Sequence, residues 1–208
     1  MYNINMQNYV YTIGYASFQI DEFIEKLRSL KISCLIDVRS IPVSSEYYQQ
    51  YSKTYLEPLL KSNGIYYRNY ATEFGARQDK DIYYQKYGYL DFELFRTSEE
   101  FISGVQKIKK GMELGYTFAL MCAEKEPCAC HRTILVAKGL KDFGFSIKHI
   151  TSNGDLLSQE DIETKLLNMY FPNRGQLGLF NTKTEEDYIK EAYQLQNAKI
   201  GYKKDGAA

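Results

Sequence analysis

The stretch that decides the fold is YTFALMCAEKEPCACHRTILVAKGL, residues 116–140. It opens with an apolar run of strand length, Thr117–Met121, and continues into a short polar loop. That loop contains the reactive side chains of Cys122, Glu124, Cys128 and Cys130. The stretch closes on His131-Arg132 and on apolar residues at helical spacing up to Leu140. A strand, a reactive loop and a helix start suit a site, because the first N–H groups of a helix lack intrahelical partners and can hold an anion.

Outward from this stretch, the chain alternates between strand-like and helix-like segments. Strands are predicted at residues 9–14, 33–38, 65–68 and 146–150, and helices at 20–30, 55–62, about 97–110, 132–144 and 159–170. The run Ser33–Val38 is apolar without alternation, which predicts burial on both faces, as in a parallel sheet. We therefore expect an α/β fold: a mainly parallel sheet of about five strands, with helices on both faces and a C-terminal extension.

Three regions are predicted along the chain: a loose N-terminus at 1–8, an α/β domain at 9–170, and a tail at 171–208 that ends in a helix. The composition of the chain changes at Phe171, where loop-forming residues begin to interrupt the apolar pattern. We expect the tail to be an appendage of the domain rather than a second core.

The totals of the chain limit the class of protein. Lys+Arg and Asp+Glu are both 26 among 208 residues, so a strongly basic nucleic-acid binder is not indicated globally. Three of the four cysteines lie between Cys122 and Cys130, unlike the scattered framework of a secreted disulfide protein. No signal peptide is recognisable, and no apolar run approaches the roughly 20 residues of a membrane span. We expect a cytoplasmic protein with no membrane partner.

Tyrosine is unusually frequent, with 20 Tyr, 11 Phe and no Trp. The tyrosines concentrate between Tyr47 and Tyr89. Such rings can stack on nucleic-acid bases, but Tyr is also a general half-buried residue, so both interpretations stay open.

Several polar motifs directly follow predicted strands. These are Gly14-Tyr15, Asp37 to Arg39, and the loop from Cys122 to Arg132. The carboxyl ends of parallel strands meet at one edge of the sheet, where ligands bind in such folds. We expect the three motifs to converge there. His149 lies within a predicted strand and is expected to be a hydrogen-bonded core residue.

The cysteine loop admits a metal site as a minority interpretation. Three thiolates and an imidazole form a zinc ligand set, here Cys122, Cys128, Cys130 and His131. Because Cys130 and His131 are adjacent, joint binding of one ion is awkward. We therefore expect no cofactor.

Two catalytic interpretations of the same loop stay open beside simple packing. A thiolate at a helix start next to Arg132 and His131 has a lowered pKa and can act as a nucleophile, and either Cys130 or Cys122 could serve. Alternatively, Arg132 and the helix N–H groups bind a phosphate or carboxylate while Glu124 or His131 moves a proton. Asp37 and Arg39 form either an internal ion pair or a substrate contact.

An ordered set of motifs resembles the domain-of-unknown-function family 488 of bacteria and archaea. The motifs are TIGY (12–15), LIDVRSIPVS (35–44), a Tyr-Ser-Lys…Leu segment (51–56), NGIYY (63–67) and LMCAEKEPCACHR (120–132). The resemblance covers roughly residues 10–150. It implies an α/β domain whose site lies at these motifs, and it adds to the substrate-binding candidates, which become Gly14, Tyr15, Asp37, Arg39, Ser44, Tyr67 and Arg132. Family members often carry His where this chain has Tyr15, and Leu-Gly-Gly where it has Phe74-Gly75-Ala76.

A looser resemblance connects the chain with rhodanese-like sulfurtransferases. They share an Asp-Val-Arg strand end, as at Asp37–Arg39, and a cysteine loop after a strand, as at Cys122. Their compact six-residue loop is absent from this sequence.

The tail contains a short peptide that resembles the motif by which bacterial DNA polymerases and repair proteins bind the sliding clamp. Its residues are Gln176, Leu177, Leu179 and Phe180. Loop-forming residues flank it, which favours the exposure that an anchor peptide needs.

The leading hypothesis is an enzyme that hydrolyses a glycosidic or phosphate bond in nucleic acid or a nucleotide, in DNA repair or maintenance. Glu124 is the expected acid, base or water-orienting group. The alternatives are a rhodanese-like or phosphatase-like cysteine enzyme and a clamp-tethered module that binds nucleic acid without turnover.

Overall fold

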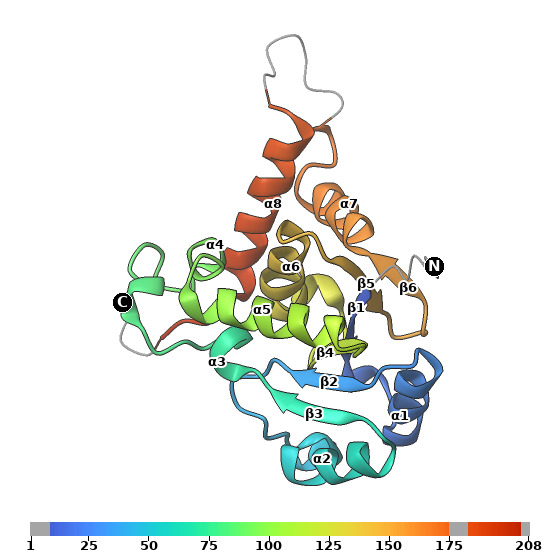
Figure 1. The fold of residues 1–208 in the computed structure, drawn as a ribbon. Coiled ribbons are helices and arrows are strands. Elements are labelled where there is room, and N and C mark those ends of the chain that lie inside the picture. Colours follow the sequence, from blue (N-terminus) through green and yellow to red (C-terminus); the bar gives the residue numbers. More distant parts are fainter. Residues whose placement is uncertain (1–8, 175–182, 205–208) are drawn as a thin grey trace.

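The computed structural model describes residues 9–174 and 183–204, which form a six-stranded sheet in the order β3-β2-β4-β1-β5-β6 (Figure 1). The strands are β1 (Tyr9–Gly14), β2 (Cys34–Asp37), β3 (Tyr66–Asn69), β4 (Phe118–Cys122), β5 (Ser146–Ile150) and β6 (Leu156–Ser158). Only β6 is antiparallel to its neighbour. The predicted α/β class is confirmed. The sequence analysis missed β6, because three residues are too few to show a strand period.

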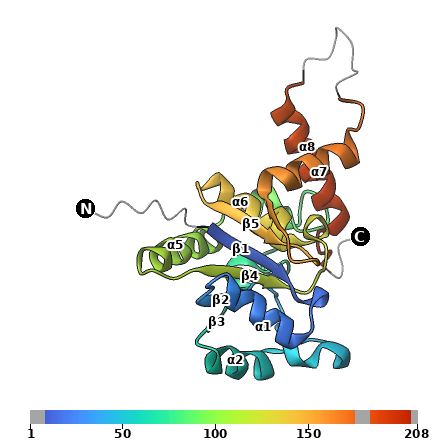
Figure 2. The ribbon, with the colours of Figure 1, turned by 90° about the vertical axis from the view of Figure 1, so that its right-hand side faces the viewer.

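Helices cover both faces of the sheet (Figure 2). The α-helices are α1 (Ile20–Ser29), α2 (Lys53–Ser62), α3 (Ala71–Phe74), α4 (Phe92–Phe95), α5 (Glu99–Glu113), α6 (Lys138–Asp142), α7 (Gln159–Tyr170) and α8 (Glu185–Ile200). Helices α1 and α2 pack on one face, and α5 and α6 pack on the other. None of the helices in the described parts of the chain has the length and hydropathy needed to cross a membrane.

The core explains why the strands read as continuous apolar runs. In β4, Leu120 packs with the α5 side of the sheet, and the next residue, Met121, packs with the α1 side. All five residues of β4 are buried. Successive side chains of a strand point to opposite faces, so a strand covered on both sides needs apolar residues at every position.

The strand order places a topological switch point between β1 and β4. The chain leaves β1 through α1 towards β2, whereas it leaves β4 through α6 towards β5, on the other side. Gly14 at the end of β1 is in register with Cys122 at the end of β4. Ligands of open α/β sheets bind in the crevice that such divergent connections leave at the carboxyl ends of the strands. The fold therefore places the cysteine loop at its most suitable binding position.

The C-terminal helix α8 packs on α7 and returns to the domain (Figure 1). The Asn197 side chain accepts a hydrogen bond from Phe92 N and donates one to Leu90 O, both at 2.9 Å. Gln196 donates a hydrogen bond of 2.6 Å to the carbonyl of Cys128 in the cysteine loop. The terminal helix thus contacts the loop that follows β4.

Candidate active site

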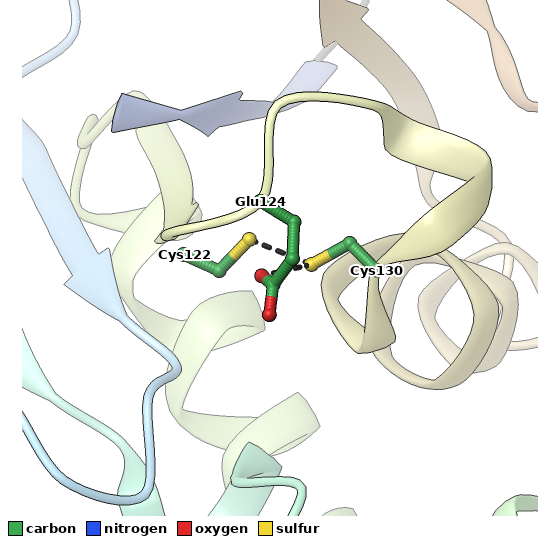
Figure 3. Close-up of side chains that lie close together, drawn as sticks. All are labelled: Cys122, Glu124 and Cys130. Atoms are coloured by element: carbon green, nitrogen blue, oxygen red, sulfur yellow. Dashed lines mark hydrogen bonds between the residues drawn. The ribbon is translucent and has the colours of Figure 1, made fainter. Parts of the chain in front are cut away.

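The loop after β4 brings three reactive side chains together at the sheet edge (Figure 3). The sulfurs of Cys122 and Cys130 lie 2.6 Å apart, and the Cys130 thiol donates to Glu124 Oε2 at 2.9 Å. Cys122 is the last residue of β4, whereas Cys130 precedes the π-helical turn Arg132–Ala137 that leads into α6. The sequence analysis predicted that this loop meets Gly14-Tyr15 and Asp37 to Arg39 at one sheet edge. In the sheet, Gly14 is in register with Cys122, and Asp37 is in register with Met121.

Arg132 closes the loop from beneath. It is fully buried, and its Nη1 donates to Cys122 Sγ at 2.7 Å and to the backbone carbonyl of Glu124 at 2.5 Å. Burial lowers the pKa of the guanidinium, but the neighbouring Cys122 and Cys130 outweigh that effect and raise it, so the charge persists. The side chain is used to hold the loop, which favours a positioning role over direct contact with a phosphate.

Cys122 is placed as a neutral thiol. Its side chain is fully buried, and burial together with the hydrogen bond that it donates to Cys130 raises the pKa of Cys122 well above its ordinary value. The nearby Arg132 opposes the shift without overcoming it. Since the thiolate is the nucleophilic form of cysteine, this environment disfavours Cys122 as the group that attacks a substrate arriving from solution.

Glu124 is the member of the cluster that reaches solvent. Burial of its carboxyl raises the pKa, but hydrogen bonds with Cys122 and Cys130 outweigh it, and the pKa of Glu124 lies below its ordinary value. His131 lowers it further. The exposed group is therefore ionised at neutral pH and can accept a proton or orient a water molecule.

His131 ties the loop to the neighbouring strand. Its Nε2 lies 2.9 Å from the carbonyl of Val38, just after β2, and its Nδ1 lies 3.9 Å from Cys130 Sγ. The ring is buried. It bridges the ends of β2 and β4.

The structure separates the zinc ligand set proposed from the sequence. Cys122 and Cys130 meet with Glu124 as a third group, but the His131 ring is turned to Val38. Two thiolates bound to one zinc ion at about 2.3 Å in tetrahedral geometry are roughly 3.8 Å apart. The observed separation of 2.6 Å does not fit that arrangement. Cys122, Glu124 and Cys130 nevertheless bring two sulfurs and a carboxylate oxygen within 4.8 Å of one another, a group that could hold a metal ion.

Gly14 is required where the loop crosses the end of β1. A Cβ atom at this position would lie 2.0 Å from the carbonyl oxygen of Glu124 and 2.9 Å from Arg132 Nη1. Ala16 N also donates to the carbonyl of Ala123 at 3.2 Å. The TIGY motif thus lets the backbone of the cysteine loop pass directly over the end of β1.

Asp37 and Arg39 form a closed ion pair at the end of β2. Arg39 donates to Asp37 Oδ1 through Nε at 2.9 Å and to Oδ2 through Nη2 at 2.6 Å. Tyr67 OH donates to Oδ2 at 2.6 Å, and burial followed by the charge of Asp37 raises the pKa of Tyr67 above its ordinary value. Asp37 is 0% exposed. The geometry supports the internal ion pair among the two roles left open by the sequence.

The same network extends to the other predicted substrate-binding residues. Arg39 donates to Ser44 Oγ and to the Tyr51 carbonyl, each at 2.8 Å. Ser44 donates to Tyr15 OH at 3.1 Å, and the Tyr15 ring stacks on Tyr51 with centroids 4.5 Å apart. These residues pack against one another, so they shape the rim beside the crevice.

Sequence reasoning missed two contributors to this edge. Tyr51 stacks on Tyr15, and the concentration of tyrosines after Tyr47 was its only signal. Gln196 holds the Cys128 carbonyl from the C-terminal helix, and no local pattern announces a contact across 68 residues of sequence. The clamp-like residues Gln176, Leu177, Leu179 and Phe180 lie outside the described residues.

The comparisons with known proteins give a family and no activity. Residues 19–138, more than half of the 208-residue chain, match the family model "Domain of unknown function DUF488". The chain belongs to this family, as its motifs predicted. No curated protein and no solved structure matches the chain.

Proposed function

For this member of the DUF488 family, we propose an enzymatic role in which Glu124 activates water to hydrolyse a glycosidic or phosphate bond in nucleic acid or a nucleotide. The observation that carries the proposal is an exposed carboxylate with a lowered pKa at the switch point of the sheet. A general base must be ionised and reachable by its substrate, and Glu124 combines both properties.

The surrounding residues hold this carboxylate in one orientation. The Cys130 thiol donates to Oε2 of Glu124, and we assign the reacting water molecule to Oε1. Arg132 fixes the backbone of Glu124 through the 2.5 Å bond to its carbonyl. Water gives a proton to Glu124 as its oxygen bonds to the reacting carbon or phosphorus. The glycosidic or phosphate bond breaks, and the leaving group departs with the proton that Glu124 took up. Cys130 and Arg132 are positioning residues in this scheme.

Exposed aromatic side chains between residues 47 and 55 support a nucleotide substrate. Tyr47 is 76% exposed and Tyr55 is 55% exposed. A hollow of about 630 Å³ on the same loop region is lined by Ser44, Lys53 and Tyr55. Exposed tyrosine rings stack on bases, and a lysine can contact phosphate. The zero net charge of the chain favours a short or single-nucleotide substrate over a long polyanion.

A panel of nucleosides, nucleotides and short single- and double-stranded oligonucleotides tests the proposal. Glu124→Gln removes the base, and we expect turnover to fall about 10²–10⁴-fold, the usual contribution of a general base. Glu126→Gln is the matched control, because Glu126 is exposed in the same loop and belongs to no part of the cluster. Equal losses in both variants, or no loss in either, contradict the assignment.

A cysteine enzyme is the second candidate, and one contact favours it. The backbone N–H of Arg132 donates to Cys130 Sγ at 3.4 Å, at the start of the helical segment. Helix N–H groups stabilise a thiolate. This alternative predicts that Cys130 reacts with iodoacetamide much faster at neutral pH than the other three cysteines; slow, uniform labelling counts against it.

A DNA-maintenance setting is proposed from the tail peptide. Leu177, Leu179 and Phe180 supply the apolar anchors, and Gln176 supplies the hydrogen bonds, of a sliding-clamp ligand. A pull-down with purified bacterial clamp compares the intact chain with Leu179→Ala plus Phe180→Ala. We expect retention of the intact chain alone. Equal retention of both proteins would exclude the tail peptide as a specific clamp ligand. If the intact chain does not bind, the clamp is excluded as a partner and the proposed cytoplasmic enzyme has no tether to it.

A further inference from the structure

We propose that Cys122 and Cys130 form a reversible oxidation site, at which a hydroperoxide converts the two thiols to a disulfide. The sulfurs lie 2.6 Å apart, and both residues are free thiols in the structure. A disulfide bond is about 2.05 Å long, so a movement of roughly half an ångström joins them. The disulfide links Cys122, the last residue of β4, to Cys130, the residue before His131.

The contacts of each sulfur set the order of the reaction: Cys130 reacts with the peroxide first, and Cys122 reacts second. Cys130 gives its proton to Glu124, its hydrogen-bond partner at 2.9 Å, and the thiolate attacks one peroxide oxygen. The O–O bond breaks, which leaves a sulfenic acid on Cys130, and the departing alkoxide or hydroxide takes the proton from Glu124 and leaves as an alcohol or water. Cys122 then attacks the Cys130 sulfur and loses its proton to the departing hydroxide, so the second product is water. The dithiol loses two electrons and the peroxide gains them.

The roles of the two cysteines follow from their partners. Cys130 lies directly beneath the solvent-exposed Glu124, whereas Cys122 is held behind it by Arg132 at 2.7 Å. Both sulfurs are buried, so the oxidant reaches Cys130 first through its contact with Glu124, and Cys122 behind it resolves the sulfenic acid. Because resolution needs no diffusion, oxidation stops at the disulfide rather than continuing to the sulfinic acid.

The other two cysteines are internal controls. Cys34 begins β2 and pairs in register with Phe118, at the opposite end of β4 from Cys122. Cys128 is half-buried and does not join the cluster. Neither has a sulfur partner among the described residues.

Oxidation alters the groups that hold Glu124. The disulfide removes the thiol proton that Cys130 donates to the carboxylate. It also replaces the polarisable Cys122 sulfur that accepts from Arg132 with a weaker acceptor. If Glu124 is the general base, a consequence that rests on the proposed function, oxidation lowers turnover and a dithiol reductant restores it.

The test reads the linkage itself on the full chain without any substrate. Reduced protein is treated with tert-butyl hydroperoxide, denatured and alkylated, and its intact mass and peptides are measured. We expect two alkylated cysteines instead of four, a mass loss of about 2 Da before alkylation, a Cys122–Cys130 peptide, and full reversal by dithiothreitol. Cys34→Ser plus Cys128→Ser should keep the 2 Da loss, the linked peptide and the reversal, but should show no alkylated cysteine after oxidation instead of two.

Three results overturn the proposal: four alkylated cysteines after treatment, a linkage that includes Cys34 or Cys128, or sulfinic acid on Cys130 without a linkage. Cys122→Ser checks the order of steps, because Cys130 should then stop at a sulfenic acid that dimedone traps. If that variant does not fold, the wild-type mass and linkage still decide. Failure of hydrolysis leaves this result untouched, so the two proposals fail independently.

Discussion

Two neighbouring strand ends carry an acidic residue and an arginine, yet they are built in opposite ways. At the end of β2, Asp37 is fully buried and accepts from Arg39 and Tyr67. After β4, Glu124 reaches solvent, and one of its oxygens accepts from Cys130. The arginine differs as well: Arg39 pairs with the carboxylate, whereas Arg132 binds the Glu124 backbone and a sulfur.

The comparison teaches where chemistry can occur. A carboxylate saturated by buried donors holds its loop and has no free lone pair for a ligand, so it contributes to the fold. A solvent-exposed carboxylate whose backbone is fixed from below can contact a substrate. The Asp37 network therefore supports the rim, and the Glu124 cluster is the candidate for function.

The largest expected loss of stability comes from breaking the hydrogen-bonded network around Asp37. Asp37→Asn leaves the buried Arg39 charge without its partner, and we expect a loss of about 3–5 kcal/mol in the free energy of unfolding. Glu124→Gln should change it by less than about 0.5 kcal/mol, since that side chain is exposed. Urea unfolding of both variants measures the difference. Similar losses in the two would erase the distinction between the sites.

A pH titration sharpens the comparison by adding a third polar centre. His149 in β5 is 0% exposed. Its Nδ1 lies 2.8 Å from Thr12 Oγ1, and its Nε2 lies 2.7 Å from Gln159 Oε1. Burial lowers the pKa of His149 to about 3. The unfolded chain therefore binds a proton below about pH 6.5 that the folded chain refuses, and stability falls as the pH drops from there towards 3.

The size of this loss is on the order of a few kcal/mol at pH 4. His149→Gln keeps hydrogen-bonding groups but does not titrate, so its unfolding free energy should vary less with pH over this range. An equally steep acid loss in the variant would assign the effect to other groups, the two carboxylates included. Urea unfolding at a series of pH values measures it.

A smaller loss of stability is expected when the backbone of the loop around Glu124 is displaced. Gly14→Ala forces a Cβ against the Glu124 carbonyl, and the loop must shift at a cost of about 1–3 kcal/mol. We expect turnover by the Glu124 site to fall while the Asp37 network stays intact. Retention of full activity would show that the loop position does not matter. Crystal structures of the two proteins would locate the shift.

The smallest effect concerns the contact from the C-terminal helix. Gln196→Ala removes the 2.6 Å bond to the Cys128 carbonyl, and the loss of one such bond costs about 0.5–1.5 kcal/mol. Hydrogen exchange should rise at the amides of residues 127–130 and remain unchanged at Asp37. Faster exchange at both strand ends would mean that Gln196 supports the whole edge.

The elements around the site were predictable for a physical reason. A both-face-buried strand such as Cys34–Asp37 must be apolar throughout, and the polar residues after it must lie at the sheet edge. The same reasoning predicted the position of the Cys122 loop. It also predicted that His149 is a hydrogen-bonded core residue, and the structure confirms this.

The orientation of the charged groups was not predictable from local pattern. Arg132 reads as an anion ligand in the sequence, but it lies beneath the loop because Gly14 leaves room for the crossing backbone. The contact from Gln196 depends on how α8 returns to the domain. Such long-range arrangements are decided by packing, which no short window of sequence contains.

The central claim is that Glu124 works as an ionised base, and the pH dependence of kcat/KM on a hydrolysed substrate tests it most directly. Because the active form is the carboxylate, activity should persist as the pH falls and should decline only below the ordinary Glu pKa of about 4.3. The acid limb should vanish, along with most of the activity, in Glu124→Gln and remain in Glu126→Gln. An acid limb near pH 6, or one that survives in Glu124→Gln, would contradict the account.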